Sequence, residues 1–348
     1  MPMSDFYNID PQEKVAIFSE IANNMRMKPF AVEKDWWVSR TLEIIFQMPI
    51  AKHLVFKGGT SLSKAWKLIH RFSEDIDLAI DKEYFGFSGN LGKHQRDKLR
   101  KVAGAYTTGT FFEELQQTFE LQGFRNLIFV VIDAEDSDQD PRVLEIYYPS
   151  VITPDSEYIL PRVQLEISCR SLREPFLHKS FGSLVDEYFI GNNFVNPLFE
   201  IPTVIPERTL LEKLFLLHEE FHRPAEKMRV DRLSRHLYDV FHLTKKGITS
   251  KAISEKQLYQ AIVDHRYNFS KVVGVDYNLH NPNTLNPIPP DDVIKNWEND
   301  YLKMREDMIF EDDKPSFEDI INNLIEVKAQ LRSVDWQFDL DFPPLSHH

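Results

Sequence analysis

The chain has 348 residues, and 42% of them are hydrophobic, which is enough to bury a large core in two domains. The single cysteine, Cys169, excludes an intrachain disulfide framework, and no stretch approaches the roughly 18 consecutive apolar residues of a membrane span. The N-terminus lacks an export signal, so we expect a cytoplasmic protein with no membrane contact, and the net charge of -13 argues against a surface that binds nucleic acid as a whole.

The first 170 residues mix helical and strand patterns. Apolar residues recur every three or four positions in the helical segments and at alternate positions in the strand segments. The pattern predicts helices over 10–24, 30–47, 61–70, 93–104 and 110–122, and strands over 53–56, 76–80, 127–133, 143–148 and 162–168. Strands mixed with helices in this way indicate an α+β sheet layer.

Beyond about residue 200, the strand signals vanish. The pattern predicts helices over 206–221, 229–245, 254–267, 290–308 and 316–332. The proline-rich segment 281–290, NPNTLNPIPP, is a predicted loop. The change of pattern near 195–205 predicts two domains, a mixed one over residues 1–200 and a helical one over residues 201–348.

Two carboxylates stand at alternate positions around the start of the predicted strand 76–80. Because side chains alternate across a strand, Asp75 and Asp77 point to one face, while Ile76 and Leu78 point into the core. Carboxylates on one face repel each other unless a cation lies between them, and hard oxygen ligands suit Mg²⁺ or Mn²⁺. Taken alone, the pattern is also that of a solvated strand edge.

A glycine turn precedes these carboxylates by about fifteen residues. Gly58 and Gly59 leave their backbone N–H groups uncovered, and Thr60 and Ser61 follow at a predicted helix N-terminus, which makes a cradle for an anion. A glycine pair by itself is common. A phosphate cradle joined to a carboxylate pair through strand, turn, helix and strand indicates phosphoryl or nucleotidyl transfer.

These residues also carry a family resemblance. GGTSL at 58–62 and RFSEDIDL at 71–78 resemble the signature of the polymerase-β-like nucleotidyltransferases and, more narrowly, of the AbiEii/AbiGii abortive-infection toxins of type IV toxin–antitoxin systems. VEKDWWV at 32–38 and RHLYDV at 235–240 are similar to the same family, so the resemblance spans about residues 30–245. It implies a polymerase-β-like core completed by a helical C-terminal domain. It also implies transfer of a nucleoside monophosphate from a nucleoside triphosphate to RNA, in some cases tRNA, and a cognate antitoxin.

The resemblance implies a third metal-binding carboxylate on a later strand. Glu166 in RVQLEIS is the best match, and Glu145 in VLEIYYP is its rival. Glu166 stands among Val163, Leu165 and Ile167, where a charged side chain costs several kcal/mol unless it is paired or bound to metal.

The resemblance also implies a lysine and an aspartate on C-terminal helices that hold and orient the nucleotide. Lys213 in TLLEKLFLL and Asp239 in HLYDVFHL match them. Where the family often has an acid shortly after the lysine, this chain has Leu217 and His218. An ordinary surface lysine and a structural ion pair remain the alternatives for these two positions.

A second motif points to different chemistry. His218-Glu219-Glu220-Phe221-His222 reads HExxH, which on a helix places two histidines on one face for zinc with a glutamate as general base. The longer zinc-binding form is absent, and Pro224 ends the helix where such a site needs it to continue. A packed helix face explains the same residues, and a zinc hydrolase is the lesser alternative.

Basic residues gather locally on this acidic chain. Residues 93–101 carry five bases against one acid, and residues 223–235 carry five against two. A solvated helix face explains either run. If the acceptor is RNA, the first run predicts phosphate contacts from Lys93, Arg96, Arg100 and Lys101. A nucleotide-binding or protein-modifying role on the same fold stays open, because a fold does not determine its substrate.

Overall fold

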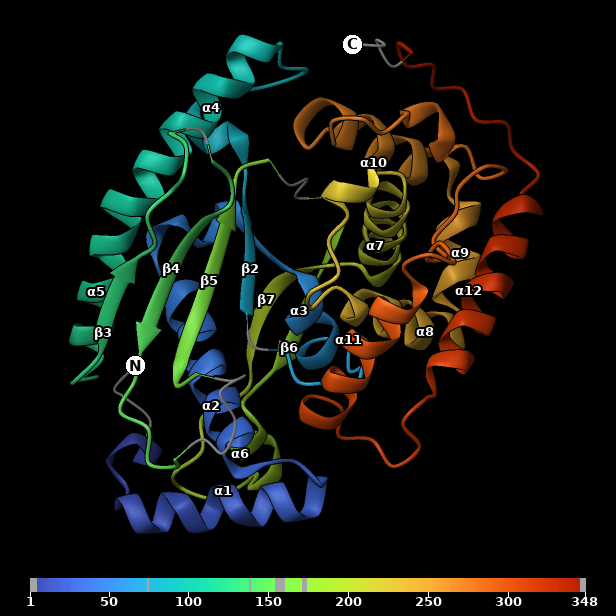
Figure 1. Ribbon diagram of the computed structural model, residues 1–348. Helices are drawn as coiled ribbons and strands as arrows, with labels where there is room; N and C mark the ends of the chain where they lie inside the picture. The colour runs from blue at the N-terminus through green and yellow to red at the C-terminus, as the bar shows by residue number, and fades with distance from the viewer. Residues whose placement is uncertain (1–4, 74, 138, 154–159, 171–173, 345–348) are drawn as a thin grey trace. The chain divides into compact units, whose positions relative to one another are not determined.

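A mixed seven-stranded sheet forms the centre of the N-terminal part of the chain (Figure 1). The computed structural model describes residues 5–73, 75–137, 139–153, 160–170 and 174–344. The strands are β1 (Leu54–Lys57), β2 (Asp75–Ile80), β3 (Ile128–Val131), β4 (Arg142–Tyr147), β5 (Arg162–Ser168), β6 (Phe176–Phe181) and β7 (Phe199–Val204). Their order is β3-β4-β5-β2-β1-β7-β6. β2 pairs with β5 and β1 pairs with β7 in parallel, and the other neighbours are antiparallel.

The sheet has one apolar face because its strands alternate. Ile76 and Leu78 of β2 and Val163 and Leu165 of β5 are buried in one hydrophobic core. The polar residues between them are partly exposed and belong to the opposite face. Burial therefore decides which face of the sheet remains available for chemistry.

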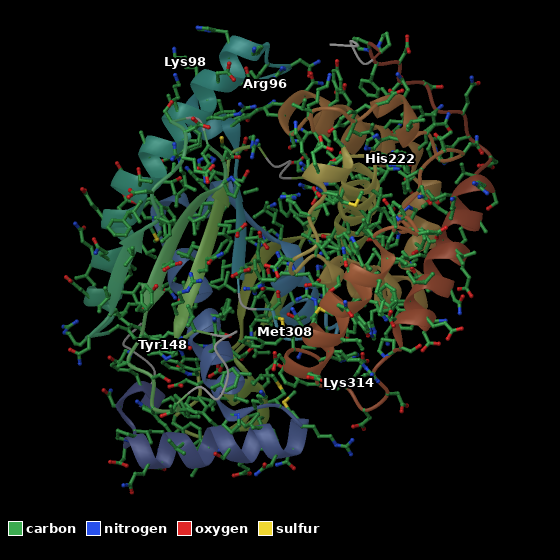
Figure 2. The ribbon with its side chains drawn as sticks, viewed as in Figure 1. Arg96, Lys98, Tyr148, His222, Met308 and Lys314 are labelled. Atoms are coloured by element: carbon green, nitrogen blue, oxygen red, sulfur yellow. The ribbon has the colours of Figure 1, made fainter. Side chains whose placement is uncertain are left out.

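The same unit also contains helices. They are α1 (Pro11–Met25), α2 (Pro29–Ile45), α3 (Gly58–Lys64), α4 (Lys93–Tyr106), α5 (Phe112–Leu121) and α6 (Leu184–Tyr188), and a π-helical segment, Thr107–Phe111, joins α4 to α5. α2 is buried along nearly its whole length and packs against β5, α1, α5 and α6. Its Trp37 stacks on Tyr148, which is labelled in Figure 2, with 4.9 Å between the ring centroids. These contacts make α2 the rigid centre of the unit.

The chain divides into two compact units. One comprises Met1–Lys67 and Phe72–Val204, and the other comprises Leu68–Arg71 and Ile205–His348. The helices of the second unit are α7 (Pro206–Phe221), α8 (Ser234–Lys245), α9 (Ile248–Ser254), α10 (Lys256–Phe269), α11 (Ile294–Asp307) and α12 (Phe317–Arg332). The second unit is thus helical, as predicted, and it also holds a short segment of the N-terminal half. In the described part of the chain, no helix is both long enough and apolar enough to cross a membrane.

The α+β fold class is confirmed, but several predicted elements differ. β6 and β7 were missed, and β7 lies within the predicted domain boundary near 195–205. The predicted helix 61–70 instead ends at Lys64, and Lys67 has a left-handed backbone (φ 52°). The predicted helix 229–245 begins only at Ser234, because Asp300 accepts hydrogen bonds from the backbone N–H groups of Arg232 (2.8 Å) and Ser234 (2.9 Å).

Candidate active site

Three carboxylates from two adjacent strands share one face of the sheet. In β2, the partly exposed Asp75 and Asp77 alternate with the buried Ile76. In the parallel strand β5, Glu166 lies directly opposite Asp77, and Gln164 lies opposite Asp75. Residues paired in register project to the same side of a sheet, so Asp75, Asp77 and Glu166 form one polar row.

Glu145 lies on the same face of the sheet, but its carboxylate already forms an ion pair with a basic side chain. It lies opposite Gln164 in β4 and forms an ion pair with Arg162. Tyr147 donates a hydrogen bond to it (2.7 Å), and this bond raises the pKa of the Tyr147 hydroxyl. Glu166 instead accepts a hydrogen bond from the neutral amide of Gln164 (3.1 Å). The register sets Glu166, and not Glu145, opposite Asp77, and the choice of Glu166 as the third carboxylate remains a prediction.

The backbone at Gly58 passes so close to Asp77 that there is no room for a side chain at position 58. Its φ of +79° lies in the left-handed region that favours glycine. A Cβ atom at this position would lie 1.9 Å from Oδ2 of Asp77. Lys57, the preceding residue, is the register partner of Asp77 in β1. The glycine turn and the Asp77 carboxylate are thus immediate neighbours.

The hydroxyl groups of the turn bind the protein backbone. Thr60 Oγ1 lies 2.5 Å from the carbonyl oxygen of Asp75 and 2.9 Å from Ser73 Oγ, and Ser61 donates to the carbonyl oxygen of Gly58 (2.8 Å). The backbone N–H groups at the start of α3 precede its first internal hydrogen bond and so stay available to an anion. Phosphate contacts from the two hydroxyls remain a prediction. Glu74, part of the motif in the sequence, lies outside the described residues.

The donor set suits a divalent ion that is shared with a substrate. Among the residues that the structure describes, no three His, Cys, Asp or Glu side chains converge closely enough to hold a metal ion by themselves. Mg²⁺ typically takes one or two carboxylates and completes its shell with phosphate oxygens and water. Asp75 and Asp77 provide such a pair. Glu166 is turned toward Gln164, and its role as a metal ligand remains a prediction.

In the second unit, Asp239 is the centre of a buried ionic cluster. Arg71 binds it at two points, Nε to Oδ1 (2.7 Å) and Nη2 to Oδ2 (2.8 Å). Lys213 also contacts Oδ2 (2.8 Å) and lies 3.3 Å from Nδ1 of His236. Asp239 is fully buried and Lys213 nearly so. Lys213 is therefore not the surface lysine that one alternative proposed. Asp239 does take part in structural ion pairs, and its partners in them are Arg71 and Lys213.

Two basic side chains, Arg71 and Lys213, contact the Asp239 carboxylate in this cluster. Burial alone would raise the pKa of Asp239, but the charges of Arg71 and Lys213 outweigh burial and hold that pKa well below its ordinary value. Burial lowers the pKa of Lys213, against the opposing charge of Asp239. Lys213 and Asp239 were predicted from the sequence, whereas Arg71 was not. The available signal was that Arg71 opens the RFSEDIDL motif.

The residues of the HExxH motif are engaged in packing. α7 ends at Phe221, so His222 lies beyond the helix, and its Nδ1 is 2.7 Å from the carbonyl oxygen of His218. Burial alone would raise the pKa of Glu219, but its ion pair with Arg266 outweighs burial and lowers the pKa to about 2. A carboxylate held in this way is a poor general base. These contacts argue against the zinc hydrolase alternative.

The first basic run lies on α4, where Figure 2 labels Arg96 and Lys98. Arg96 donates a hydrogen bond to the carbonyl oxygen of Leu91 (2.6 Å), and Arg100 pairs with Asp97 (3.3 Å), so both arginines are partly committed within the chain. The exposed bases are Lys93, Lys98 and Lys101. Of the four residues predicted to contact RNA, Lys93 and Lys101 are exposed, and Lys98, which was not among the four, is exposed on the same helix.

A mixed sheet with an Asp-x-Asp strand beside a glycine turn, followed by a helical unit, defines the nucleotidyltransferase class of fold. The chain belongs to the AbiEii family, described as nucleotidyl transferase AbiEii toxin of type IV toxin–antitoxin systems, whose family profile matches residues 40–323. The match continues well beyond residue 245, where the resemblance in the sequence ended, and it begins after VEKDWWV.

The solved structure of one nucleotidyltransferase toxin supports the fold. MenT4, a nucleotidyltransferase toxin from Mycobacterium tuberculosis H37Rv, is 18% identical, with a TM-score of 0.52 over 91% of this chain and 90% of that chain. JHP933 from Helicobacter pylori is 15% identical, with a TM-score of 0.38 over 84% of this chain and 89% of that chain. At such identities the likeness concerns the fold alone. No curated protein sequence matches the chain.

Proposed function

We propose that this member of the AbiEii family transfers a nucleoside monophosphate from a nucleoside triphosphate to a hydroxyl group of RNA, with tRNA as the favoured acceptor. One observation carries the proposal. Asp77 lies directly opposite Glu166 and beside the left-handed Gly58, so carboxylates and the first backbone N–H groups of α3 lie close together. Nucleotidyl transfer needs both, because catalysis consists mainly of holding a polyphosphate and balancing its charge.

Each part of the site has a role in this proposal. The backbone N–H groups of Gly58 and Gly59 bind the outer phosphates, and Thr60 and Ser61 hold that turn in shape. Asp75 and Asp77 would hold Mg²⁺ or Mn²⁺, which, when bound, would neutralise phosphate charge and lower the pKa of the acceptor hydroxyl. Glu166 lies opposite Asp77 in the sheet and accepts a hydrogen bond from Gln164, and it is proposed as the third metal-binding carboxylate.

Lys213 and Asp239 are proposed to contact the nucleotide from the helical unit. Lys213 and Arg71 both contact the Asp239 carboxylate, and two basic side chains gathered in this way favour a polyphosphate. In this scheme Lys213 offsets the charge that develops on the leaving pyrophosphate, and Asp239 orients the lysine.

The proposed partners follow from the family and from the charge pattern. Lys93, Lys98 and Lys101, supported by Arg96 and Arg100, are proposed to contact the RNA backbone. Membership of a toxin family that belongs to type IV systems supports a cognate antitoxin, with both proteins acting in the cytoplasm. Growth arrest on induced expression, relieved by Asp75→Ala, is the expected behaviour of such a toxin.

The direct test is to ask what becomes labelled. Each of the four nucleoside triphosphates, labelled at the α-phosphate, is incubated with the purified chain, Mg²⁺ and a cell extract, and Asp77→Asn serves as the inactive control. Label that ribonuclease removes and protease does not supports the proposal. Label in protein would overturn the RNA acceptor, and no label with any of the four would overturn nucleotidyl transfer.

A further inference from the structure

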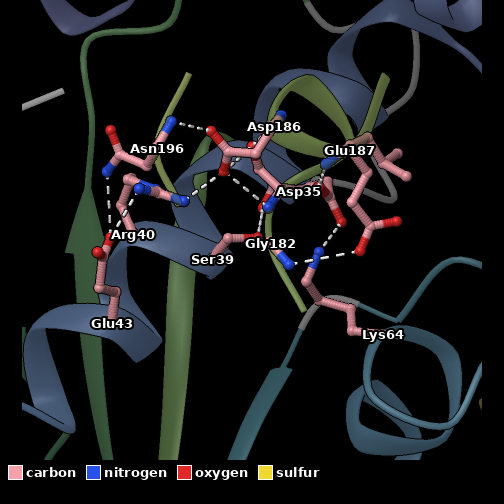
Figure 3. A network of polar contacts seen from close by, with 11 residues as sticks. Asp35, Ser39, Arg40, Glu43, Lys64, Gly182, Asp186, Glu187 and Asn196 are labelled. Atoms are coloured by element: carbon pink, nitrogen blue, oxygen red, sulfur yellow. Dashed lines mark hydrogen bonds and ion pairs between the residues drawn. The ribbon is translucent and has the colours of Figure 1, made fainter. Parts of the chain in front are cut away.

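α3 is a short helix that is anchored at both ends. At its start, Thr60 contacts the backbone of Asp75, as described above. At its end, Lys64 forms an ion pair with Asp35 of α2 (Figure 3). The side chains of this pair are only 8% and 10% exposed. A helix of seven residues has few internal hydrogen bonds, so its orientation depends on such outside contacts.

Asp35 is itself fixed by a second contact. Its other carboxylate oxygen accepts a hydrogen bond from the backbone N–H of Leu184 (2.7 Å), the first residue of α6. α6 is tied to α2 a second time, because Asp186 binds Arg40 (2.5 Å) and caps the helix through Ser183. Figure 3 shows these contacts as one network. Asp35 thus stands on the most buried helix of the unit and cannot shift without disturbing two others.

A neighbouring ion pair with more exposed side chains serves for comparison. Lys67, three positions further along, pairs with Glu187, but these side chains are 62% and 25% exposed. A surface pair of this kind contributes about 0–1 kcal/mol. Breaking a buried pair has a larger effect, because the partner that remains is charged and has lost its counterion.

We infer that Asp35 and Lys64 are a positioning pair for the phosphate-binding turn. The pair touches neither the carboxylate row nor the proposed phosphate site, and it acts through α3. It holds the end of the helix, and thereby sets where the N–H groups of Gly58 and Gly59 point. The inference rests on the proposed function for its link to phosphate, while the mechanical part concerns the protein alone.

Amide hydrogen exchange tests the mechanical part without any nucleotide. In Lys64→Met, exchange in peptides covering residues 57–66 should rise about tenfold, while peptides covering β4 and β5 keep their protection. Lys67→Met is the matched control, since it removes a lysine from the same region that has an exposed partner. Equal exchange in the two variants would overturn the inference, whether or not the wild-type chain binds a triphosphate.

Nucleotide kinetics test the link to phosphate. Asp35→Asn and Lys64→Met should each raise KM for the triphosphate about tenfold and change kcat less, because the turn holds the substrate and does not react. Lys64→Arg keeps the charge and should restore most of the affinity. The double variant should lose little more than either single variant, because one interaction is removed in all three.

Hydrogen exchange and kinetics together distinguish the mechanical role of the Asp35–Lys64 pair from its role in phosphate binding. Raised exchange together with raised KM and rescue by arginine supports the positioning pair. Raised exchange with an unchanged KM would overturn its role in phosphate binding. A wild-type chain that binds none of the four triphosphates would overturn the proposed function, and a raised exchange in Lys64→Met would then still support the pair as the anchor of the turn.

Discussion

Arg71 forms a bidentate ion pair with Asp239 inside the helical unit, although the two residues lie 168 positions apart in the sequence. Arg71 belongs to the four-residue segment Leu68–Arg71, which leaves the strand-and-helix unit between α3 and β2. The backbone N–H of Phe310 donates to the carbonyl oxygen of His70 (3.1 Å) and holds the same segment. The helical unit therefore contains the connection between the glycine turn and the Asp-x-Asp strand.

Removing Arg71 should destabilise the helical unit. Arg71→Met leaves the fully buried Asp239 with Lys213 as its remaining counterion, so we expect a loss of about 3 kcal/mol, the lower end for a broken buried pair. Lys295→Met is the control, because Lys295 forms an exposed pair with Glu298 and should change stability by under about 0.5 kcal/mol. Urea unfolding followed by circular dichroism measures both variants. Equal midpoints would contradict the role given to Arg71.

Adding a single methyl group at Gly58 should impair the site. Gly58→Ala strains a backbone of φ +79° and drives a Cβ atom into the Asp77 carboxylate, so transfer should fall about a hundredfold. Gly86→Ala separates the two causes, because Gly86 has φ +78° but no atom within 4 Å of an added Cβ. That control should lose about 1 kcal/mol of stability and keep its activity. A fully active Gly58→Ala would show that the turn is not part of the site.

The three carboxylates should differ in what their removal does. Asp77→Asn is nearly isosteric and partly exposed, so it should abolish transfer and leave the unfolding midpoint almost unchanged. Glu166→Gln should also reduce transfer strongly, whereas Glu145→Gln should act mainly on stability, because Glu145 pairs with Arg162. Single-turnover assays with labelled triphosphate compare the three variants. Transfer that survives in Glu166→Gln but fails in Glu145→Gln would reverse the assignment of the third carboxylate.

Reversing charge on α4 should affect RNA and not the triphosphate. Lys93, Lys98 and Lys101 are exposed, so changing all three to glutamate should weaken RNA binding at least tenfold and flatten its dependence on salt. Arg96 is a poorer probe, since its hydrogen bond to Leu91 would also be lost. Filter binding over a series of salt concentrations gives the slope, and calorimetry gives triphosphate affinity. Equal loss of both affinities, or no loss of either, would count against this surface.

A control with the same change of charge comes from the helical unit. Lys251, Lys295 and Lys303 are exposed there, and changing them to glutamate alters the net charge by the same amount. If that variant loses RNA binding to the same extent as the α4 variant, total charge explains the effect and the location on α4 does not.

Stability should fall as the pH is lowered below about 6.5. Burial lowers the pKa of His218 well below its ordinary value of 6.5, so the unfolded chain binds a proton there that the folded chain does not. Below pH 6.5 the unfolded state is thus favoured, by up to about 1.4 kcal/mol per pH unit for each such histidine. Unfolding midpoints at pH 7.5 and 5.5 measure the change.

Two histidine variants identify its source. His218→Asn can still accept the hydrogen bond that His218 Nδ1 receives from the backbone N–H of Asn286 (3.0 Å), and it should reduce the pH dependence. His94→Asn lies on an exposed position of α4 and should leave the pH dependence as it is. A wild-type chain that is equally stable at both pH values would contradict the prediction.

Secondary structure and side-chain direction depend on neighbours a few positions apart, and the sequence alone was enough to predict them. Alternation in DIDLAI placed Asp75 and Asp77 on one face, and the glycine pair marked a turn ahead of a helix. The α+β class and the helical second half also followed from local periodicity. Such patterns are read within one turn of helix or a few residues of strand, and they hold wherever the segment finally packs.

Contacts between residues that are distant in the sequence could be identified only from the tertiary structure. Glu166 and Glu145 stand on similar strands, and it is the hydrogen-bond register of β5 against β2 that sets Glu166 opposite Asp77, while Arg162 occupies Glu145. The ion-pair partners of Asp239 and Lys64 could not be predicted either, because Arg71 and Asp35 are distant from them in the sequence. β7 carries no strong strand signal of its own, and its place between β1 and β6 forms it. Pairing across the sheet and burial of charge are properties of the folded chain, and no short window of sequence contains them.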